Sequence, residues 1–174
     1  MKKKLLVAAI TLTTVTSIYA AQGKGYREYG EKIEQSPGAN FHLEEMPPGS
    51  FGTVVANNKK KILLSVGTRT SVPSRSGRVN QYLQVDGYHD FTITNNTHQR
   101  QTYRLFVSLE CGSMRFSDSR YVDIEPGGYY TRNDHSYGAV QQAYPGSYRI
   151  AAETSLDGES SHSSRDSNTL YVSK

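Results

Sequence analysis

From Ile62 to the C-terminus, apolar and polar residues alternate in short runs, and no stretch has the spacing of an amphipathic helix. The clearest run, from Tyr103 to Cys111, carries Tyr, Leu, Val, Leu and Cys at every second position. A period of two sends one set of side chains into a core and leaves the other outside. This part of the chain is therefore predicted to be all-β.

Turn signals separate these runs. They are four polar or Gly/Pro segments, at 95–99, 112–113, 126–128 and 145–146. Roughly seven or eight short strands without intervening helices predict a single antiparallel β-sandwich over residues 62–174. A strand is expected to end before Pro126, and a separate one is expected to begin at Tyr129.

Three of these segments resemble parts of immunoglobulin-like domains. Glu125–Gly128 resembles the connection before strand E, and Pro145–Ile150 resembles the start of strand F. Phe91–Thr97 and the run after it resemble strands B and C of bacterial immunoglobulin-like or fibronectin-III-like modules. The resemblance covers residues 62–174 and implies that Tyr148 forms a corner by bonding its hydroxyl to nearby backbone. The B–F disulfide and core Trp of antibody domains are missing, because the chain has one Cys and no Trp.

The N-terminus has the pattern of an export signal. Lys2–Lys4 form a basic start, an apolar segment begins at Leu5, and Ala20 offers a small residue for cleavage. We expect residues 1–20 to be a bacterial Sec-type signal peptide that is removed, which leaves a periplasmic or secreted protein without a stable membrane span. A retained anchor is the alternative, but Leu5–Ala21 is barely long enough to cross a bilayer.

Residues 21–61 differ from the rest in composition. They are rich in Gly, Glu, Lys and Pro, with breakers at 36–38 and 47–49. We expect a mostly disordered, flexible N-terminal arm. Its short apolar run, Thr53–Ala56, could form an edge strand or become ordered on a partner.

The net charge of +4 derives mostly from the N-terminus. Without Lys2, Lys3 and Lys4, seventeen basic residues face sixteen acidic ones. This near balance gives no reason to expect nucleic-acid binding.

No arrangement of residues predicts catalysis, a cofactor or a metal site. The five histidines include no pair at the spacing of a helical zinc site. Asp86, His89 and Asp90 form the tightest acidic and histidine cluster. His89 shares the phase of Phe91 and is expected to be a hydrogen-bonded residue at a sheet edge, while Asp90 lies on the outward face. Cys111 is in phase with apolar residues, so we expect a buried thiol and not a nucleophile.

Tyr and Arg give the binding signals. Four Tyr flank one long connection, which also holds Asp134-His135 in a polar loop, and Tyr offers large contact area with a polar tip. Between Ile62 and Ser173 there are ten Arg and no Lys, and three Arg cluster in a Ser/Thr-rich loop. The candidate binding residues are Tyr129, Tyr130, Tyr137, Tyr144, Arg69, Arg75 and Arg78.

These observations favour an exported, non-enzymatic protein–protein interaction module, such as an accessory subunit of a bacterial cell-envelope or secretion assembly. Its partners would be other envelope or secreted proteins, bound through loop-borne Tyr and Arg or by pairing at an open sheet edge. The first alternative is a secreted carbohydrate- or ligand-binding module, which a planar row of exposed Tyr would support. A small secreted enzyme or effector would need a cleft where His, Asp or Cys side chains converge. A solitary chaperone would need a hydrophobic edge groove with a basic anchor.

Overall fold

The structure, a computed structural model, describes residues 22–47, 64–157 and 162–174, and all regular elements in these ranges are β-strands. The expected signal peptide and the run Thr53–Ala56 lie outside the described residues. No helix in the described ranges has the length and apolar character needed to cross a membrane. The described strands are β1 (Gln22–Gln35), β2 (Phe41–Glu45), β3 (Leu64–Ser71), β4 (Arg75–Arg78), β5 (Tyr82–Asn95), β6 (Gln101–Cys111), β7 (Met114–Gln141), β8 (Gly146–Asp157) and β9 (His162–Ser173).

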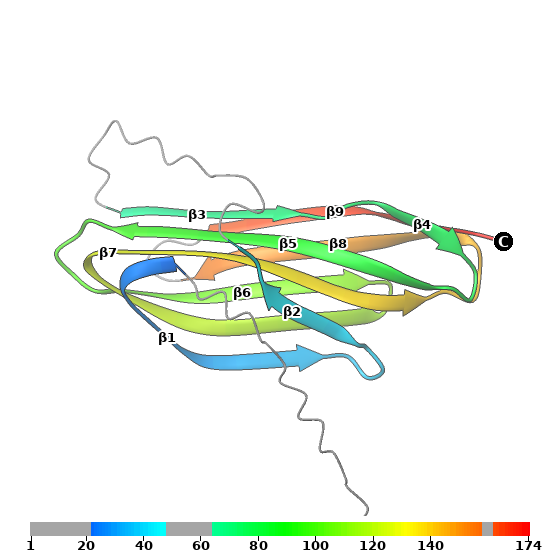
Figure 1. The fold of residues 1–174 in the computed structure, drawn as a ribbon, viewed down its shortest axis with the longest axis horizontal. Helices are drawn as coiled ribbons and strands as arrows, with labels where there is room; N and C mark the ends of the chain where they lie inside the picture. Colours follow the sequence, from blue (N-terminus) through cyan, green and yellow to red (C-terminus); the bar gives the residue numbers. More distant parts are fainter. Residues whose placement is uncertain (1–21, 48–63, 158–161) are drawn as a thin grey trace, which may run out of the picture.

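The strands form two packed layers (Figure 1). One layer contains β3, β5 and the second half of β7, and the other contains the first half of β7 followed by β6, β8, β9 and β4. This order is that of an immunoglobulin-like sandwich, with β3, β5 and the end of β7 in the places of strands A, B and E, and β6, β8 and β9 in those of C, F and G. The prediction of an antiparallel sandwich is confirmed except at β4, which pairs with β9 in parallel.

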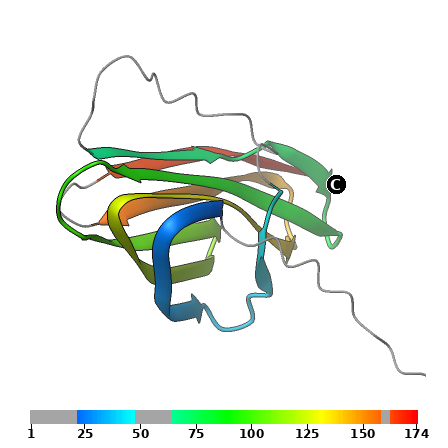
Figure 2. The same ribbon diagram turned by 60° about the vertical axis from the view of Figure 1, so that its left-hand side comes forward.

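β7 crosses from one layer to the other at its midpoint (Figures 1 and 2). Its first half pairs with β6 and its second half with β5, and the chain folds back between them at 126–128. Gly127 takes a φ of 74°, which a residue with a side chain adopts only with strain. The predicted turn is therefore in the right place. The strand nevertheless continues through it, because β1 bends alongside and pairs on both sides of the turn.

The core lies between the layers and consists of the alternating side chains that the sequence singles out. Tyr103, Leu109 and Ile150 are fully buried. Cys111 is buried as predicted, and burial raises the pKa of its thiol to about 11. The Tyr148 hydroxyl donates to the Tyr144 carbonyl at 2.8 Å, which is the corner that the family resemblance implies.

The expectation of a disordered arm is wrong for residues 22–47. β1 pairs with β7 along most of its length, and β2 pairs with residues 134–138 of β7, so both strands belong to the sandwich. Phe41 inserts into the core against Gly138, where a Cβ would lie 2.2 Å from the Phe41 ring. The polar composition that suggested disorder instead reflects two edge strands, and the breakers at 36–38 form the connection between them.

Candidate functional site

The four candidate tyrosines do not form one patch. Tyr130 is fully buried and its hydroxyl donates to Glu28, whereas its neighbour Tyr129 is exposed on the other side of β7. Tyr137 is half-buried farther along the strand, and Tyr144 is exposed in the loop before β8. Neighbouring residues of a strand face opposite ways, so the expected cluster is dispersed over two faces and a loop.

The three candidate arginines are also separated. Arg69 lies in β3 opposite Asp90 of β5. Arg75 donates from Nε and Nη2 to Asp86 Oδ2 at 3.1 and 2.6 Å. Arg78 is exposed in β4. The structure therefore does not bring them together as one binding surface, and Arg75 serves a carboxylate inside the protein.

A cluster that the sequence did not reveal lies on the outer face of the layer with β3, β5 and the second half of β7. We call it the His135 cluster, and it consists of His42, Glu44, Arg75, Asp86, Tyr88, His135 and Tyr137. His135 lies in β7, not in the predicted polar loop. Its Nδ1 is 2.8 Å from Glu44 Oε1, and its Nε2 is 2.9 Å from Asp86 Oδ1.

The bridging geometry fixes the charge of His135. Ionised carboxylates only accept hydrogen bonds, so both ring nitrogens must carry a proton to satisfy Glu44 and Asp86. Burial lowers the pKa of His135, but the hydrogen bonds to Asp86 and Glu44 outweigh it and the pKa is raised. The imidazolium thereby links β2 to β5 and β7.

Asp86 is the buried anchor of the cluster. It accepts hydrogen bonds from Gln84, Arg75 and His135, and it has no exposed surface. Burial alone would raise the pKa of Asp86, but the bonds from His135, Gln84 and Arg75 lower it to about 2. The carboxylate is thus ionised at any ordinary pH.

The rings of the His135 cluster stack on one another across the strands. The ring centroids of Tyr88 and His135 are 4.7 Å apart with an interplanar angle of 5°, and those of His135 and Tyr137 are 4.9 Å apart. His42 continues the row at 5.4 Å from Tyr137. Stacking covers the ring faces, which a sugar-binding platform would have to leave open. This row therefore holds β2, β5 and β7 together and does not form the planar Tyr surface expected of a carbohydrate-binding module.

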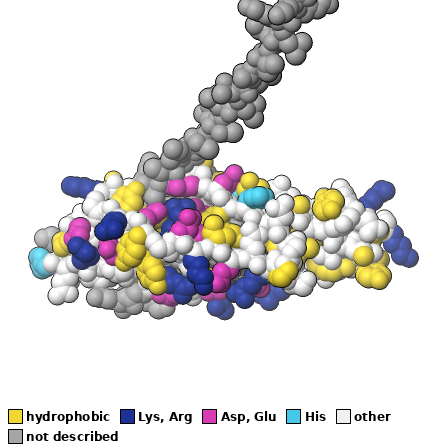
Figure 3. Space-filling view, turned by 90° about the horizontal axis from the view of Figure 1, so that it is seen from below, with side chains coloured by type: hydrophobic (Ala, Val, Ile, Leu, Met, Phe, Trp, Pro, Cys, Tyr) yellow, Lys and Arg dark blue, Asp and Glu magenta, His cyan; other side chains and the backbone are white. Residues whose placement is uncertain are grey.

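A second feature is an opening on the side of the sandwich that β1 and β2 border. A pocket of about 380 Å³ lies there, lined by β1, β2 and β7. Its walls combine the apolar side chains of Ile33, Phe41 and Phe116 with the guanidinium groups of Arg120 and Arg132. Seen from below, basic and acidic side chains are interspersed and hydrophobic ones are scattered in small groups (Figure 3).

Carboxylates hold these two guanidinium groups in place. Arg132 Nε lies 2.9 Å from both Asp134 oxygens, and its Nη1 lies 3.3 Å from Glu28 Oε2. Arg120 contacts Asp118 and, at 3.1 Å, Glu31 of β1. Since Glu28 and Glu31 belong to β1, ion pairs fix this edge strand to both halves of β7.

Within residues 22–47, 64–157 and 162–174, one Ser–His contact has the distance of a nucleophile and its base. Ser136 Oγ lies 2.8 Å from His89 Nε2, but both residues are fully buried and Ser136 donates to the Gly87 carbonyl. Burial lowers the pKa of His89 to about 3, so its ring is neutral. His89 is hydrogen-bonded as predicted, although it lies inside the sandwich and not at a sheet edge.

Asp90 is on the outer side of β5, as predicted. It is nevertheless only 4% exposed, because Arg69 of β3 and Asn133 of β7 are its neighbours on the two adjacent strands. Burial raises the pKa of Asp90 to about 6, and its Oδ2 has no hydrogen-bond partner. In the described ranges, no group of three or more His, Cys, Asp or Glu side chains is arranged to hold a metal ion.

No family model matches the chain, and no curated protein matches it. Solved structures similar to it include AggA, the major subunit of aggregative adherence fimbriae type I from Escherichia coli, with 11% identity and a TM-score of 0.36 over 63% of this chain and 95% of that one. The CARDB domain of the PF1109 protein from Pyrococcus furiosus has 11% identity and a TM-score of 0.33 over 64% of this chain and 90% of its own. A PapD-like domain of human CEP192 has 7% identity and a TM-score of 0.25, over 60% and 85%.

Proposed function

We propose that this protein is an exported, non-enzymatic protein–protein interaction module of the bacterial cell envelope, and that it binds its partner by adding a strand to the free edge of β1. The observation that carries this proposal is the position of β1. Among the described strands, β1 pairs with β7 alone, so one edge of its 14 residues has no strand beside it. Unpaired backbone groups along a strand edge form a template for another strand.

The pocket between β1 and β2 supports the same proposal. Ile33 of β1 is 55% exposed and lines this pocket together with the more deeply placed Phe41 and Phe116. Alternate side chains of an added strand point the same way, so every second one would face the pocket. Backbone pairing would supply affinity, and the pocket would select the side chains.

The chemistry of the reactive side chains favours binding over catalysis. The Cys111 thiol is buried with a pKa of about 11, which keeps it protonated at neutral pH. Ser136 and His89 are closed off from solvent. The export part of the proposal rests on the N-terminal sequence pattern.

Site-specific photo-crosslinking in intact cells tests the proposal. A photo-reactive amino acid would replace Ile33 in β1 in one strain and Tyr171 in β9 in another, since both side chains are 55% exposed. We expect one defined protein to be crosslinked from position 33 and not from position 171. The absence of any product at 33, or equal products at both positions, would contradict strand addition at β1.

Mass spectrometry of the same samples tests export. We expect the mature chain to begin at Ala21 and to be found outside the cytoplasm. An intact N-terminus in a cytoplasmic fraction would overturn the envelope assignment.

A further inference from the structure

Carboxylates outnumber guanidinium groups around the pocket beside β1. Five carboxylates and two guanidinium groups contact one another there, and we call them the β1 charge cluster: Glu28, Glu31, Glu45, Asp118, Asp134, Arg120 and Arg132. Burial raises the pKa of Glu45 and of Asp134. Even if both of these were neutral, three carboxylates would face two guanidinium groups. The cluster therefore has an excess of negative charge.

The two guanidinium groups of the β1 charge cluster are already surrounded by carboxylates. Arg120 and Arg132 each contact three of the five carboxylates, at distances of up to 3.8 Å. Both arginines line the pocket, but a further carboxylate that entered it would be repelled by the excess of acidic groups behind them. The surroundings of the pocket favour a positively charged occupant.

Two carboxylates of the cluster lack hydrogen bonds. Asp118 is only 3% exposed, and its Oδ1 is buried without a hydrogen-bond partner. It lies on the same side of β7 as Phe116 and Arg120, which both line the pocket. The Glu45 side chain contacts a described cation only at 3.7 Å, which is beyond hydrogen-bond distance. Because buried acceptors without donors are unfavourable, a further cation beside the cluster would be stabilising.

A strand added to the free edge of β1 would pass directly beside these carboxylates. Glu28 bonds Arg132 at 3.3 Å, and Glu31 bonds Arg120 at 3.1 Å, so both glutamate side chains lie on the pocket side of β1. Ile33 lines the pocket and lies on the same side. Alternate residues of an added strand would also face this side. A residue opposite Glu31 would therefore be two positions away from a residue opposite Ile33.

Glu31 is the carboxylate of the cluster that a partner reaches most easily. Its side chain is 58% exposed, and only its Oε1 is bonded to Arg120. The second oxygen of Glu31 can accept a hydrogen bond from a partner. Ile33 presents an exposed apolar side chain instead. The free edge of β1 thus offers an acidic contact and an apolar contact at successive positions on one side.

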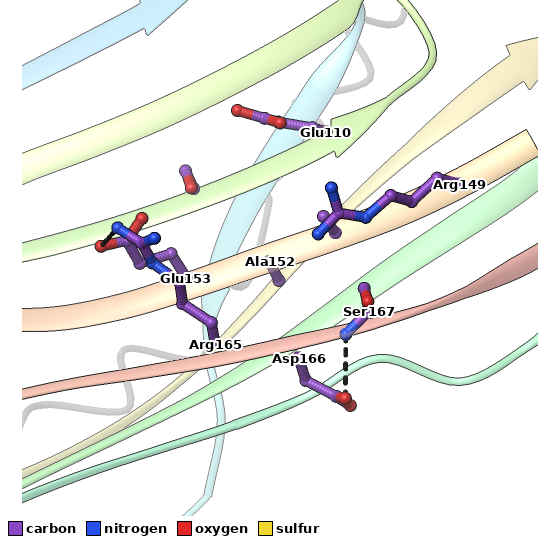
Figure 4. Close-up of a pocket in the computed structure, with 9 residues that line it drawn as sticks. Glu110, Arg149, Ala152, Glu153, Arg165, Asp166 and Ser167 are labelled. Atoms are coloured by element: carbon purple, nitrogen blue, oxygen red, sulfur yellow. Dashed lines mark hydrogen bonds and ion pairs between the residues drawn. The ribbon is translucent and has the colours of Figure 1, made fainter.

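The depression on the outer face of β6, β8 and β9 has a different arrangement of charges (Figure 4). Glu153 is paired with Arg165 and Glu110 with Arg115, both at 3.1 Å. Asp166 accepts hydrogen bonds from two backbone N–H groups. All three carboxylates of this depression have partners, so it gives no sign of a missing cation, in contrast to the β1 charge cluster.

We propose that the strand added at β1 carries an apolar side chain opposite Ile33 and a lysine or arginine two positions away, opposite Glu31. This inference rests on the proposed strand addition and specifies the chemistry of the partner. The cation bonds Glu31 and offsets the negative charge of the cluster, while the apolar side chain covers Ile33 and the apolar wall of the pocket. The partner is therefore a protein with an extended segment in which apolar and basic residues alternate with residues of the opposite face.

NMR titration of the full chain with three blocked peptides tests this inference. The first is acetyl-Thr-Val-Thr-Lys-Thr-Val-Thr-amide, whose symmetrical pattern places an apolar residue two positions from the lysine in either strand direction. The second has norleucine in place of lysine, and the third has glutamate. We expect the lysine peptide to shift the backbone resonances of Glu31 and Ile33 and to bind about fivefold more tightly than the norleucine peptide. The glutamate peptide should bind most weakly.

A matched pair of variants assigns the preference to one carboxylate. Glu31→Gln should remove most of the preference for lysine over norleucine. Glu34→Gln is the control, because Glu34 is also an exposed glutamate of β1 but pairs with Lys32 on the opposite side of the strand. Thermal unfolding of both variants verifies that each is folded.

The outcomes separate this inference from strand addition itself. Shifts in β1 with equal affinities for the lysine and norleucine peptides, or tightest binding of the glutamate peptide, would overturn the basic residue and leave strand addition standing. A lysine preference that survives in Glu31→Gln would overturn the contact with Glu31. The absence of shifts in β1 with any of the peptides would contradict strand addition at this edge, and this inference with it.

Discussion

His135 of β7 bonds Glu44 of β2 at 2.8 Å and thereby fastens an edge strand to the sandwich through one imidazolium group. The second ring nitrogen of His135 is bonded to the buried carboxylate of Asp86 in β5, so this one ring of β7 bonds two other strands. Because a titratable side chain holds β2 in place, the strength of this attachment depends on pH.

The first prediction concerns His135→Gln. The pKa of His135 is raised in the folded state, so its stabilising effect is present below the unfolded value of about 6.5 and is lost as pH rises through the folded value. A hydrogen bond to a charged group contributes roughly 1.5–3 kcal/mol, so we expect the substitution to cost about that much at pH 6 and less at pH 9. Urea unfolding at both pH values measures this. A cost that is equal at pH 6 and pH 9, or larger at pH 9, would contradict the imidazolium assignment.

The second prediction is that Asp90→Asn stabilises the protein at neutral pH. Burial raises the pKa of Asp90 to about 6, so the folded state binds this proton more tightly than the unfolded chain does. Stability therefore falls as pH rises from about 3.9 to about 6, and the deficit persists above that range. An amide removes the buried charge, and we expect a gain of roughly 1–3 kcal/mol at pH 7.

The control for Asp90→Asn is the same comparison at about pH 2.5, where the carboxyl group is almost fully protonated in both states. The gain should vanish there. A variant that is less stable than the parent at pH 7 would show that Arg69 compensates the Asp90 charge fully.

Much of the sandwich could be predicted from alternation, because burial between two layers imposes a period of two on the sequence. The run from Tyr103 to Cys111 shows this most clearly. β1 could not be predicted in the same way, because an edge strand with one exposed side lacks a continuous apolar face. Its place became visible only through its pairing with β7.

The functional surfaces were harder to predict, because they depend on which strands are neighbours. Glu44, Asp86 and His135 are far apart in the sequence, and only the order of β2, β7 and β5 brings them together. Tyr129 and Tyr130 looked equivalent in the sequence. After the turn at 126–128, the inward and outward alternation of β7 decides which of the two is buried. Pairing of β7 with β1 and β5 sets this alternation.

The third prediction is that Gly138→Ala weakens the attachment of β2. A Cβ at this position would lie 2.2 Å from the Phe41 ring, so Phe41 would have to leave its place in the core. Overpacking of this kind costs typically about 1–3 kcal/mol. We expect a lower thermal midpoint and faster proteolytic cleavage near Phe41.

Gly67→Ala is the matched control, because Gly67 also lies in a strand and a Cβ there would meet no atom within 4 Å. It should leave both the thermal midpoint and the cleavage rate near those of the parent. Equal behaviour of the two alanine variants would mean that β2 does not depend on the Phe41 contact.

The last prediction concerns His89 and acid stability. Burial lowers the pKa of His89 to about 3, while the unfolded residue titrates near 6.5. Between these values the unfolded state binds a proton that the folded state does not, so stability falls as pH decreases. The slope from this one residue approaches about 1.4 kcal/mol per pH unit. Urea unfolding at pH 7, 5 and 4 should show the decline, and His89→Gln should reduce it.

The ring nitrogens of His89 provide an independent measurement. His89 Nδ1 lies 2.8 Å from Thr154 Oγ1 and its Nε2 lies 2.8 Å from Ser136 Oγ, so a hydroxyl group faces each ring nitrogen. Because burial lowers the pKa of His89 to about 3, ¹⁵N shifts of the folded protein should show a neutral ring at pH 5. A protonated His89 in the folded state at that pH would mean that solvent reaches the interior between the layers, which would also reopen the Ser136–His89 pair as a site for chemistry.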